Sequence, residues 1–250
     1  MRPLILVTND DGIHSEGLKA LAEAMREIGD VTVVAPDREQ SASSHSLTLH
    51  RPLRINRVAE KTYAVEGTPT DCVYLATRSL MKGDGRPALV ASGINKGSNL
   101  GDDIHYSGTV SAAFEGTVLG IPSMAVSVVG RSPHNFATAA AFAARLAKRV
   151  LDEKLPGDTL LNVNVPNIPA AEITGVAITR MGKRHYGDAV IENTDPRGRK
   201  YYWIGGAELE AEDIPGSDCN ALLENKISVT PLHLDLTNLP AIERLSGWKL

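Results

Sequence analysis

A short apolar run that leads into paired acids constrains the fold more than any other feature of this 250-residue sequence. Leu4–Val7 is continuous and aliphatic, which is typical of a strand buried on both faces of a sheet. Asn9, Asp10, Asp11 and Gly12 follow almost at once. Adjacent carboxylates at the end of a buried strand repel each other and resist desolvation unless a cation lies between them. The stretch predicts either a divalent-metal site held by Asp10 and Asp11, or an ordinary polar turn that ends the strand.

Strand and helix patterns alternate after this opening. Apolar residues recur at helical spacing over 18–28, behind an N-cap candidate at Ser15, and 31–35 is a second apolar run. Strand, helix and strand with short connections favour a parallel sheet with right-handed crossovers, so an α/β fold is predicted. Further strands are expected at 53–58, 62–65, 88–91, 123–129, 160–165 and 227–230, and helices at about 70–80, 110–118, 136–150 and after 217, with Thr70 or Asp71 capping the first of these.

The C-terminal third does not continue this alternation. Residues 182–216 are polar, charged and Gly-rich, with an aromatic run at 201–203. Such a length without a core pattern is unusual inside a compact domain, so a projecting hairpin or an exchanged arm is expected there. We interpret 1–250 as one domain, with a core at about 1–180, an arm at about 181–230 and a C-terminal return at 231–250.

Composition excludes several classes of function. A net charge of −4 argues against a general binder of nucleic-acid polymers or membrane surfaces. No apolar run reaches the length of a bilayer span, and no basic segment followed by an apolar one opens the chain. Cys72 and Cys219 lack metal-ligand spacing and fit reduced core thiols. A cytoplasmic protein without membrane attachment is expected.

Polar loops follow three of the predicted strands, at 9–12, 37–46 and 92–109. The carboxyl ends of parallel strands share one edge of a sheet, so these loops are expected to meet there. They offer carboxylates, serine hydroxyls and the side-chain carbonyl of Asn95. Oxygen ligands of this kind suit Mg²⁺ or Mn²⁺ rather than zinc.

An anion site is predicted beside this metal site. Ser107, Gly108 and Thr109 precede a helical pattern, where free backbone N–H groups and hydroxyls can bind phosphate, and Lys96 can offset its charge. Ordinary N-capping by Ser107 or Thr109 explains the same residues equally well in isolation. A hard cation beside an anion site points to hydrolysis of phosphate esters, in which the metal polarises phosphoryl oxygens and activates water.

Four blocks of the sequence are distinctive when taken together and in order: Val7-Thr8-Asn9-Asp10-Asp11-Gly12-Ile13, Val34-Ala35-Pro36-Asp37-Arg38, Ser92-Gly93-Ile94-Asn95-Lys96-Gly97 and Tyr106-Ser107-Gly108-Thr109-Val110. They resemble the survival protein SurE family, whose members are metal-dependent nucleoside monophosphate phosphatases. The resemblance covers nearly the whole chain, least distinctively at 182–216. It implies a Rossmann-like three-layer sandwich with a C-terminal extension exchanged between subunits of a homodimer or homotetramer.

The resemblance also implies roles for individual residues. One Mg²⁺ or Mn²⁺ per subunit would be held by Asp10, Asp11, Ser41 and Asn95, of which the two aspartates are also the candidate catalytic residues. Whether either aspartate acts further as base or nucleophile stays open. The implied phosphate contacts are Asn9, Asn99, Ser107, Gly108 and Thr109, and nothing is implied for His45.

The expected reaction is hydrolysis of nucleoside 5′-monophosphates; whether 3′-monophosphates are also substrates stays open. An aspartyl-nucleophile phosphatase fits poorly, because its two aspartates are spaced one residue apart whereas Asp10 and Asp11 are adjacent. Two alternatives remain: a phosphatase for other phosphomonoesters or short polyphosphate, and a non-catalytic nucleotide-binding regulatory module. A Rossmann-like fold is compatible with all of them.

Overall fold

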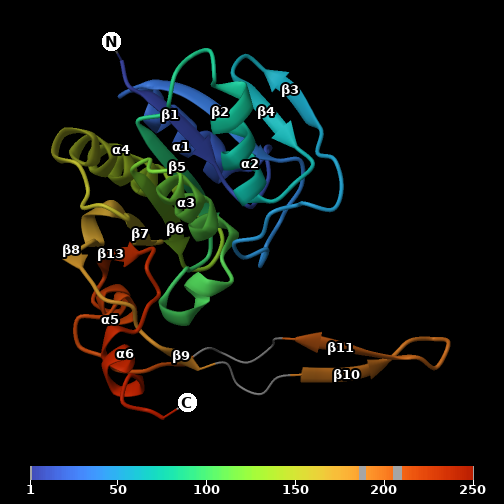
Figure 1. The fold of residues 1–250 in the computed structure, drawn as a ribbon, viewed down its shortest axis with the longest axis vertical. Coiled ribbons are helices and arrows are strands. Elements are labelled where there is room, and N and C mark those ends of the chain that lie inside the picture. Colours follow the sequence, from blue (N-terminus) through green and yellow to red (C-terminus); the bar gives the residue numbers. More distant parts are fainter. Residues whose placement is uncertain (1, 186–189, 205–209, 250) are drawn as a thin grey trace.

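A nine-stranded sheet forms the centre of the computed structural model, which describes residues 2–185, 190–204 and 210–249 (Figure 1). Its strand order is β3-β4-β2-β1-β5-β6-β7-β13-β8. All neighbours from β4 to β7 pair in parallel, and antiparallel pairs occur only at β3–β4 and β7–β13 among the strands of this sheet. The central strands are β1 (Leu4–Thr8), β2 (Asp30–Pro36), β5 (Leu89–Lys96), β6 (Ser123–Val129) and β7 (Thr159–Pro166).

Helices cover both faces of the sheet and give three layers. On one face α1 (Glu16–Arg26) and α4 (Phe136–Glu153) pack over Ile5 and Val7 of β1. On the other, α2 (Pro69–Leu75) with its continuation η1 (Ala76–Leu80) and α3 (Gly108–Val118) pack over Leu6. Successive strand residues therefore enter opposite cores, which is why the β1 sequence is apolar throughout. The predicted α/β three-layer fold is confirmed.

Two further pairs of strands complete the sheet at its two edges. At one end lie β3 (Ile55–Ala59) and β4 (Thr62–Val65), both close to their predicted ranges. At the other, β13 (Lys226–His233) separates β7 from a short strand that the sequence did not predict, β8 (Gly175–Ile178). The remaining elements there are η3 (Ala170–Glu172) and α5 (Asp218–Leu223), whose N-cap is Ser217.

The C-terminal extension contains a hairpin that projects from the body (Figure 1). Its strands are β10 (Val190–Thr194) and β11 (Lys200–Ile204). A second pair, β9 (Arg184–His185) with β12 (Glu210–Ala211), lies at its base, and α6 (Leu239–Leu245) follows near the chain end. The predicted arm also includes 186–189 and 205–209, which lie outside the described residues. Exchange of this arm between subunits stays a prediction.

Two predicted boundaries were wrong. The N-cap of helix α2 is Thr68, two or three residues before the predicted caps Thr70 and Asp71, because Thr68 forms a reciprocal capping box with Asp71. Strand β5 continues through the polar residues Ser92–Lys96, which were predicted to be loop. It pairs with β6 to its end, with a register shift between Gly93 and Asn95, so backbone pairing overrides the polar side chains.

Other predicted features agree with the structure. Ser15 caps α1, and Cys72 and Cys219 are free and buried. Within the described ranges, no helix is long and apolar enough to cross a membrane.

Candidate active site

The three polar segments meet around a cavity of about 360 Å³ at the carboxyl edge of the sheet. The strands that lead to it are β1, β2 and β5, which are direct neighbours in the sheet. The second of the three segments leaves β2, and the third comprises the end of β5 and the connection to α3. Seven of the residues predicted for the site line the cavity: Asp10, Asp11, Ser41, Asn95, Lys96, Asn99 and Ser107.

Asp10 is buried between the end of β1 and the first turn of α3. The hydroxyl of Thr109 donates a hydrogen bond to its Oδ1. Burial raises the pKa of Asp10 from 3.8 to about 6; the Thr109 hydrogen bond opposes this shift, and the nearby charge of Asp11 adds to it. Gly108 packs directly against this carboxylate, since a Cβ there would lie 2.8 Å from the Asp10 Cβ.

Asp11 faces the same cavity from the next position. Burial raises its pKa, and the charge of Lys96 lowers it in part. Lys96 Nζ lies 3.9 Å from Asp11 Oδ1, a loose ion pair. The other carboxylate oxygen, Oδ2, is buried and accepts no hydrogen bond among the described residues. An ionised oxygen in that position costs free energy unless something positive binds it.

Asn9, which directly precedes the aspartates, is buried and does not line the cavity. Its Nδ2 donates to Gly12 O at 3.2 Å and to Ser15 Oγ at 2.8 Å, which ties the loop to the start of α1. Its Oδ1 is buried without a hydrogen-bond partner in the described part of the chain. The Asn9 side chain therefore holds the loop that carries Asp10 and Asp11 in place.

The loop at 37–46, which leaves β2, is held by backbone hydrogen bonds to the segment after β1 and to the segment before α3. Gln40 N donates to Asp10 O at 2.8 Å, and Ser44 N donates to Tyr106 O at 3.2 Å. Ser41 lies on the cavity and donates to Glu39 Oε1 at 2.6 Å. Ser43 Oγ lies 2.8 Å from where a Cβ on Gly108 would be. This loop therefore brings Ser41 to the cavity that Asp10 lines.

The two asparagines of the third segment differ in their surroundings. Asn95 is half-buried at the end of β5, and its Nδ2 donates to Gly97 O at 3.1 Å. Asn99 is buried in an amide network: its N–H donates to Asn164 Oδ1 at 3.0 Å and its Nδ2 to Ser127 Oγ at 2.8 Å. Asn162 donates to the Asn99 carbonyl at 2.8 Å. Asn99 is thus fixed from two further strands, β6 and β7.

The predicted anion site is the first turn of α3. Ser107 is its N-cap, accepting from Val110 N at 3.1 Å, so the capping interpretation holds for Ser107. Thr109 instead uses its hydroxyl on Asp10. Neither Gly108 nor Thr109 is among the side chains that line the cavity. Any contact they make to an anion there would come from backbone N–H groups.

Four lining residues were missed by the sequence analysis: Glu39, Ala42, Asp103 and Tyr106. Asp103 pairs with Arg184 of β9, so the C-terminal part of the chain reaches the rim of the cavity. Burial raises the pKa of Asp103, and Arg184 opposes the shift. Nothing local in the sequence links positions 103 and 184.

His45 and Asp218 act at the edges of the site. His45 Nε2 lies 2.9 Å from the buried Glu115 Oε2 on α3, and His45 is not among the lining residues. Asp218, the first residue of α5, is buried and accepts from Gly101 N at 2.9 Å and from Gly182 N at 2.7 Å. It thereby joins the C-terminal part of the chain to η2 (Gly101–His105), which precedes the α3 N-terminus.

The donor chemistry of this cavity fits a hard divalent cation. The buried oxygens of Asp11 and Asn9 that lack partners are atoms that a cation or its bound water would satisfy. In the described ranges no three His, Cys, Asp or Glu side chains come together as metal ligands. A site here would combine the two carboxylates with neutral oxygens, as from Ser41 and Asn95, which suits Mg²⁺ or Mn²⁺.

Comparison with known proteins agrees with this architecture. A family model described as "Survival protein SurE" matches residues 5–188. The chain is 57% identical to a Geobacter sulfurreducens protein named "5'-nucleotidase SurE", over 98% of this chain and 94% of the relative. It is 56% identical to a Myxococcus xanthus protein of the same name, over 98% and 93%. The crystal structure of the SurE protein from Aquifex aeolicus, 46% identical, superposes with a TM-score of 0.84 and covers 98% of this chain and 100% of that one. The chain belongs to the survival protein SurE family.

Proposed function

We propose that this protein hydrolyses the phosphate ester of nucleoside 5′-monophosphates, releasing nucleoside and inorganic phosphate. The observation that carries the proposal is the buried Asp10–Asp11 pair, with an unpartnered Asp11 oxygen, beside the first turn of α3. The names of the Geobacter and Myxococcus relatives support the same activity. A site that only bound nucleotides would need the anion-binding turn but not a costly carboxylate pair.

Asp10, Asp11, Ser41 and Asn95 would hold one Mg²⁺ or Mn²⁺. When bound, this cation supplies polarisation of the phosphoryl oxygens and activation of the attacking water. The chain's own residues set the environment: Thr109 orients the Asp10 carboxylate by donating to it, and burial of both aspartates favours occupancy by a cation. Asp10 and Asp11 are therefore the residues on which catalysis depends.

The phosphate would bind at the start of α3, where the helix has a partial positive charge. Ser107 and Lys96 line the cavity there, and the backbone N–H groups of Gly108 and Thr109 lie at the same end of the helix. Asn99 would contact the phosphate from the other side. Asn9 does not line the cavity, so it would act by holding the loop of Asp10 and Asp11 through its hydrogen bonds to Gly12 and Ser15.

The test is phosphate release from a panel of substrates in Mg²⁺, Mn²⁺ or EDTA. The panel contains nucleoside 5′- and 3′-monophosphates, a generic aryl phosphate and tripolyphosphate. Metal-dependent turnover that favours 5′-monophosphates supports the proposal, and 3′ turnover would extend it. Faster turnover of the aryl phosphate or tripolyphosphate would favour the broader phosphatase, and binding without turnover would favour a regulatory module.

Assembly and location belong to the same proposal. The β10–β11 hairpin exposes Val190, Tyr202, Trp203 and Ile204, an apolar surface that a partner subunit would cover in a homodimer or homotetramer. We expect the protein to act in the cytoplasm on small nucleotides rather than on nucleic-acid polymers, consistent with its net charge of −4.

A further inference from the structure

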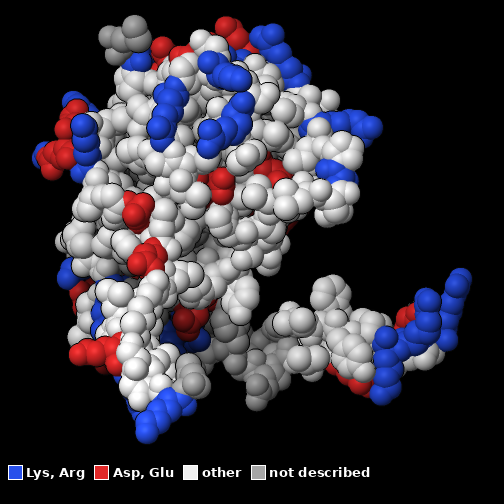
Figure 2. Space-filling model, in the orientation of Figure 1, with Lys and Arg blue, Asp and Glu red and all other residues white. Residues whose placement is uncertain are grey.

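A second cavity lies near the amino ends of β1 and β5, remote from the candidate active site. It has a volume of about 360 Å³ and lies between η1, the connection that leads into β5, and the end of α3. Three of its lining residues are cations, Arg78, Lys82 and Arg86, and no carboxylate lines it among the described residues. Figure 2 shows blue side chains gathered over the α2–β5 connection.

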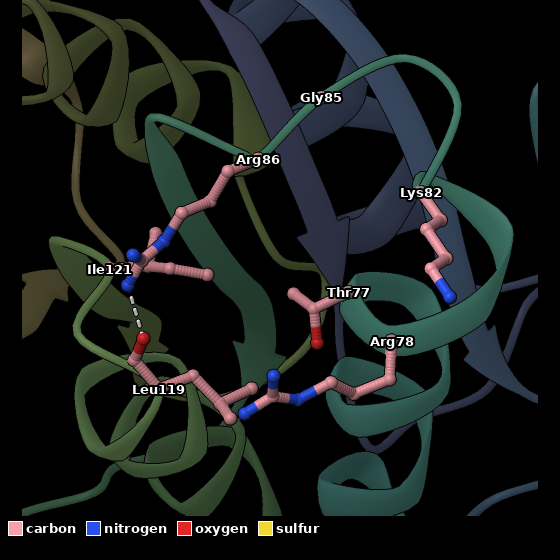
Figure 3. A pocket seen from close by; sticks show the side chains of 7 residues that line it. All are labelled: Thr77, Arg78, Lys82, Gly85, Arg86, Leu119 and Ile121. Atoms are coloured by element: carbon pink, nitrogen blue, oxygen red, sulfur yellow. Dashed lines mark hydrogen bonds between the residues drawn. The ribbon is translucent and has the colours of Figure 1, made fainter.

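The cations approach one place from different elements. In Figure 3, Arg78 extends from η1 toward the end of α3, and Arg86 reaches the same helix end from the connection before β5. Arg86 donates to Leu119 O, and its guanidinium packs over Gly120, where an added Cβ would lie 2.8 Å from Nη2. This contact fixes the Arg86 side chain.

Arg78 and Lys82 have no such partner. Neither side chain makes a hydrogen bond or an ion pair within the described part of the chain, although the protein as a whole carries more acids than bases. The Thr77 hydroxyl, which also borders the cavity, is occupied by Val73 O at 2.7 Å. The free donors of the cavity are therefore cationic.

Neutralisation of helix ends does not account for all this positive charge. The carboxyl end of a helix carries roughly −0.5 charge, and two helices, η1 with α2 and α3, end beside the cavity. Their combined partial charge is roughly −1, against three full positive charges. An excess of about two positive charges remains for a ligand.

We propose that this basic cavity binds a small anion that carries two or more linked phosphoryl groups, either inorganic diphosphate or the diphosphate moiety of a nucleotide. Guanidinium groups bind phosphate oxygens in a fork that two arginines can share between adjacent phosphoryl groups, with Lys82 as a third charge. The volume lies within the range of small-molecule sites, and Leu119 and Ile121 add an apolar wall. This goes beyond the hydrolytic function proposed above and does not depend on it.

The site is separated from the candidate active site by the length of α3. That helix begins beside Asp10 and ends beside Arg86, and its 11 residues span about 16 Å. A ligand in the basic cavity therefore makes no contact with the aspartates. Binding to the two sites can be measured independently.

The experiment is isothermal titration of the full-length Asp10→Asn protein in EDTA and low salt with diphosphate, ADP and orthophosphate. This background suppresses metal-dependent binding and turnover at the aspartates. Arg78→Gln/Lys82→Gln removes two cavity charges, and Arg145→Gln/Lys148→Gln removes two exposed charges from α4 as the matched control. Thermal unfolding verifies that each variant is folded.

We expect diphosphate and ADP to bind with one site per chain, orthophosphate to bind more weakly, and Arg78→Gln/Lys82→Gln to weaken binding about tenfold or more. The control pair should change affinity less than about twofold. Tighter binding of ADP than of diphosphate would identify a nucleotide as the occupant, whereas equal binding would identify the inorganic anion; both support the site. No binding by any probe, or equal losses in the two double variants, would overturn it. If Arg78→Gln/Lys82→Gln does not fold, Arg78→Gln alone is compared with Lys148→Gln on the same criteria.

Discussion

At the scale of single residues, Asp10 is a carboxyl group whose surroundings oppose its own charge. Its pKa rises from 3.8 to about 6 because it is buried, and the Asp11 carboxylate beside it adds to the rise. A native acid whose pKa exceeds its unfolded value is stabilising while protonated. The ionised form that a cation requires is therefore held in the folded protein at a cost to stability.

Replacing Asp10 with Asn should stabilise the metal-free protein. Without metal, ionisation of Asp10 should lower the free energy of unfolding as pH rises from about 4 through about 6, by about 3 kcal/mol in total. Asp10→Asn should be more stable than wild type by up to this amount at pH 7.5 and by less than about 1 kcal/mol at pH 4. Urea unfolding in EDTA measures both, with the exposed Asp152→Asn as control. An Asp10→Asn protein that is less stable at pH 7.5 would contradict the assignment.

Gly108 is required by contact rather than by backbone conformation. A Cβ at this position would lie 2.8 Å from both Asp10 Cβ and Ser43 Oγ. Gly108→Ala favours the helix intrinsically, yet it should displace the aspartate and reduce kcat/KM for a nucleoside monophosphate at least about tenfold. Gly157→Ala, where nothing lies within 4 Å, is the matched control and should leave the rate unchanged. Equal rates for the two variants would show that α3 does not pack on the carboxylate as described.

At the scale of elements, the site depends on segments that are far apart in sequence. Asp218, at the start of α5, accepts hydrogen bonds from Gly101 N at 2.9 Å and Gly182 N at 2.7 Å. The first of these holds η2, which carries Asp103 and leads to Tyr106 on the cavity wall. A buried carboxylate with backbone donors on both oxygens is hard to replace.

Asp218→Asn should therefore affect stability and catalysis together. The amide presents N–H groups to at least one backbone donor, which should lower the free energy of unfolding by about 1–3 kcal/mol. Displacement of η2 should also raise KM for a nucleoside monophosphate. Asp152→Asn is the control, because Asp152 is exposed on α4 and its exchange removes the same charge. Chemical denaturation measures the stability and steady-state kinetics measure KM. An unchanged KM in a destabilised Asp218→Asn protein would show that Asp218 stabilises the fold but does not position the cavity wall.

The sequence predicts local elements well, but it does not predict contacts between segments that are far apart in the chain. Apolar runs and helical spacing report which residues are buried locally, so β1, β2, β6 and α1 were predicted close to their observed ranges. The polar end of β5 was not, because its pairing is supplied by β6. The four predicted metal ligands line one cavity because they lie at or beyond the carboxyl ends of adjacent parallel strands. The contributions of Asp103 and Asp218 depend on contacts with distant segments that no local pattern encodes.

At the scale of the whole molecule, the β10–β11 hairpin exposes large apolar side chains that a single subunit leaves uncovered. Trp203 is 65% exposed and Ile204 is 92% exposed on β11. In the strand pairing, Trp203 lies opposite Ile191 and Ile204 opposite Val190. Isolated two-stranded hairpins are marginally stable in water, so coverage by another subunit would stabilise this one.

Weakening this surface should shift the protein toward monomers. Trp203→Ser with Ile204→Ser removes apolar area without touching the cavity, so the molar mass by light scattering should fall and its concentration dependence should increase. Leu223→Ser, an exposed leucine on α5, is the control. A wild-type protein that is already monomeric, or an unchanged oligomer in the double variant, would contradict exchange of the arm.

The rate of phosphate release from a nucleoside 5′-monophosphate, measured as a function of free Mn²⁺, is the direct test of a metal-dependent site at Asp10 and Asp11. Wild type should show saturable activation that EDTA abolishes, whereas Asp11→Asn should lose at least about a hundredfold in rate at saturating metal. Asp152→Asn, which removes an exposed carboxylate on α4, should follow the wild-type curve. Activity that persists in EDTA, or an Asp11→Asn curve that matches wild type, would contradict a metal-dependent nucleotidase centred on Asp10 and Asp11.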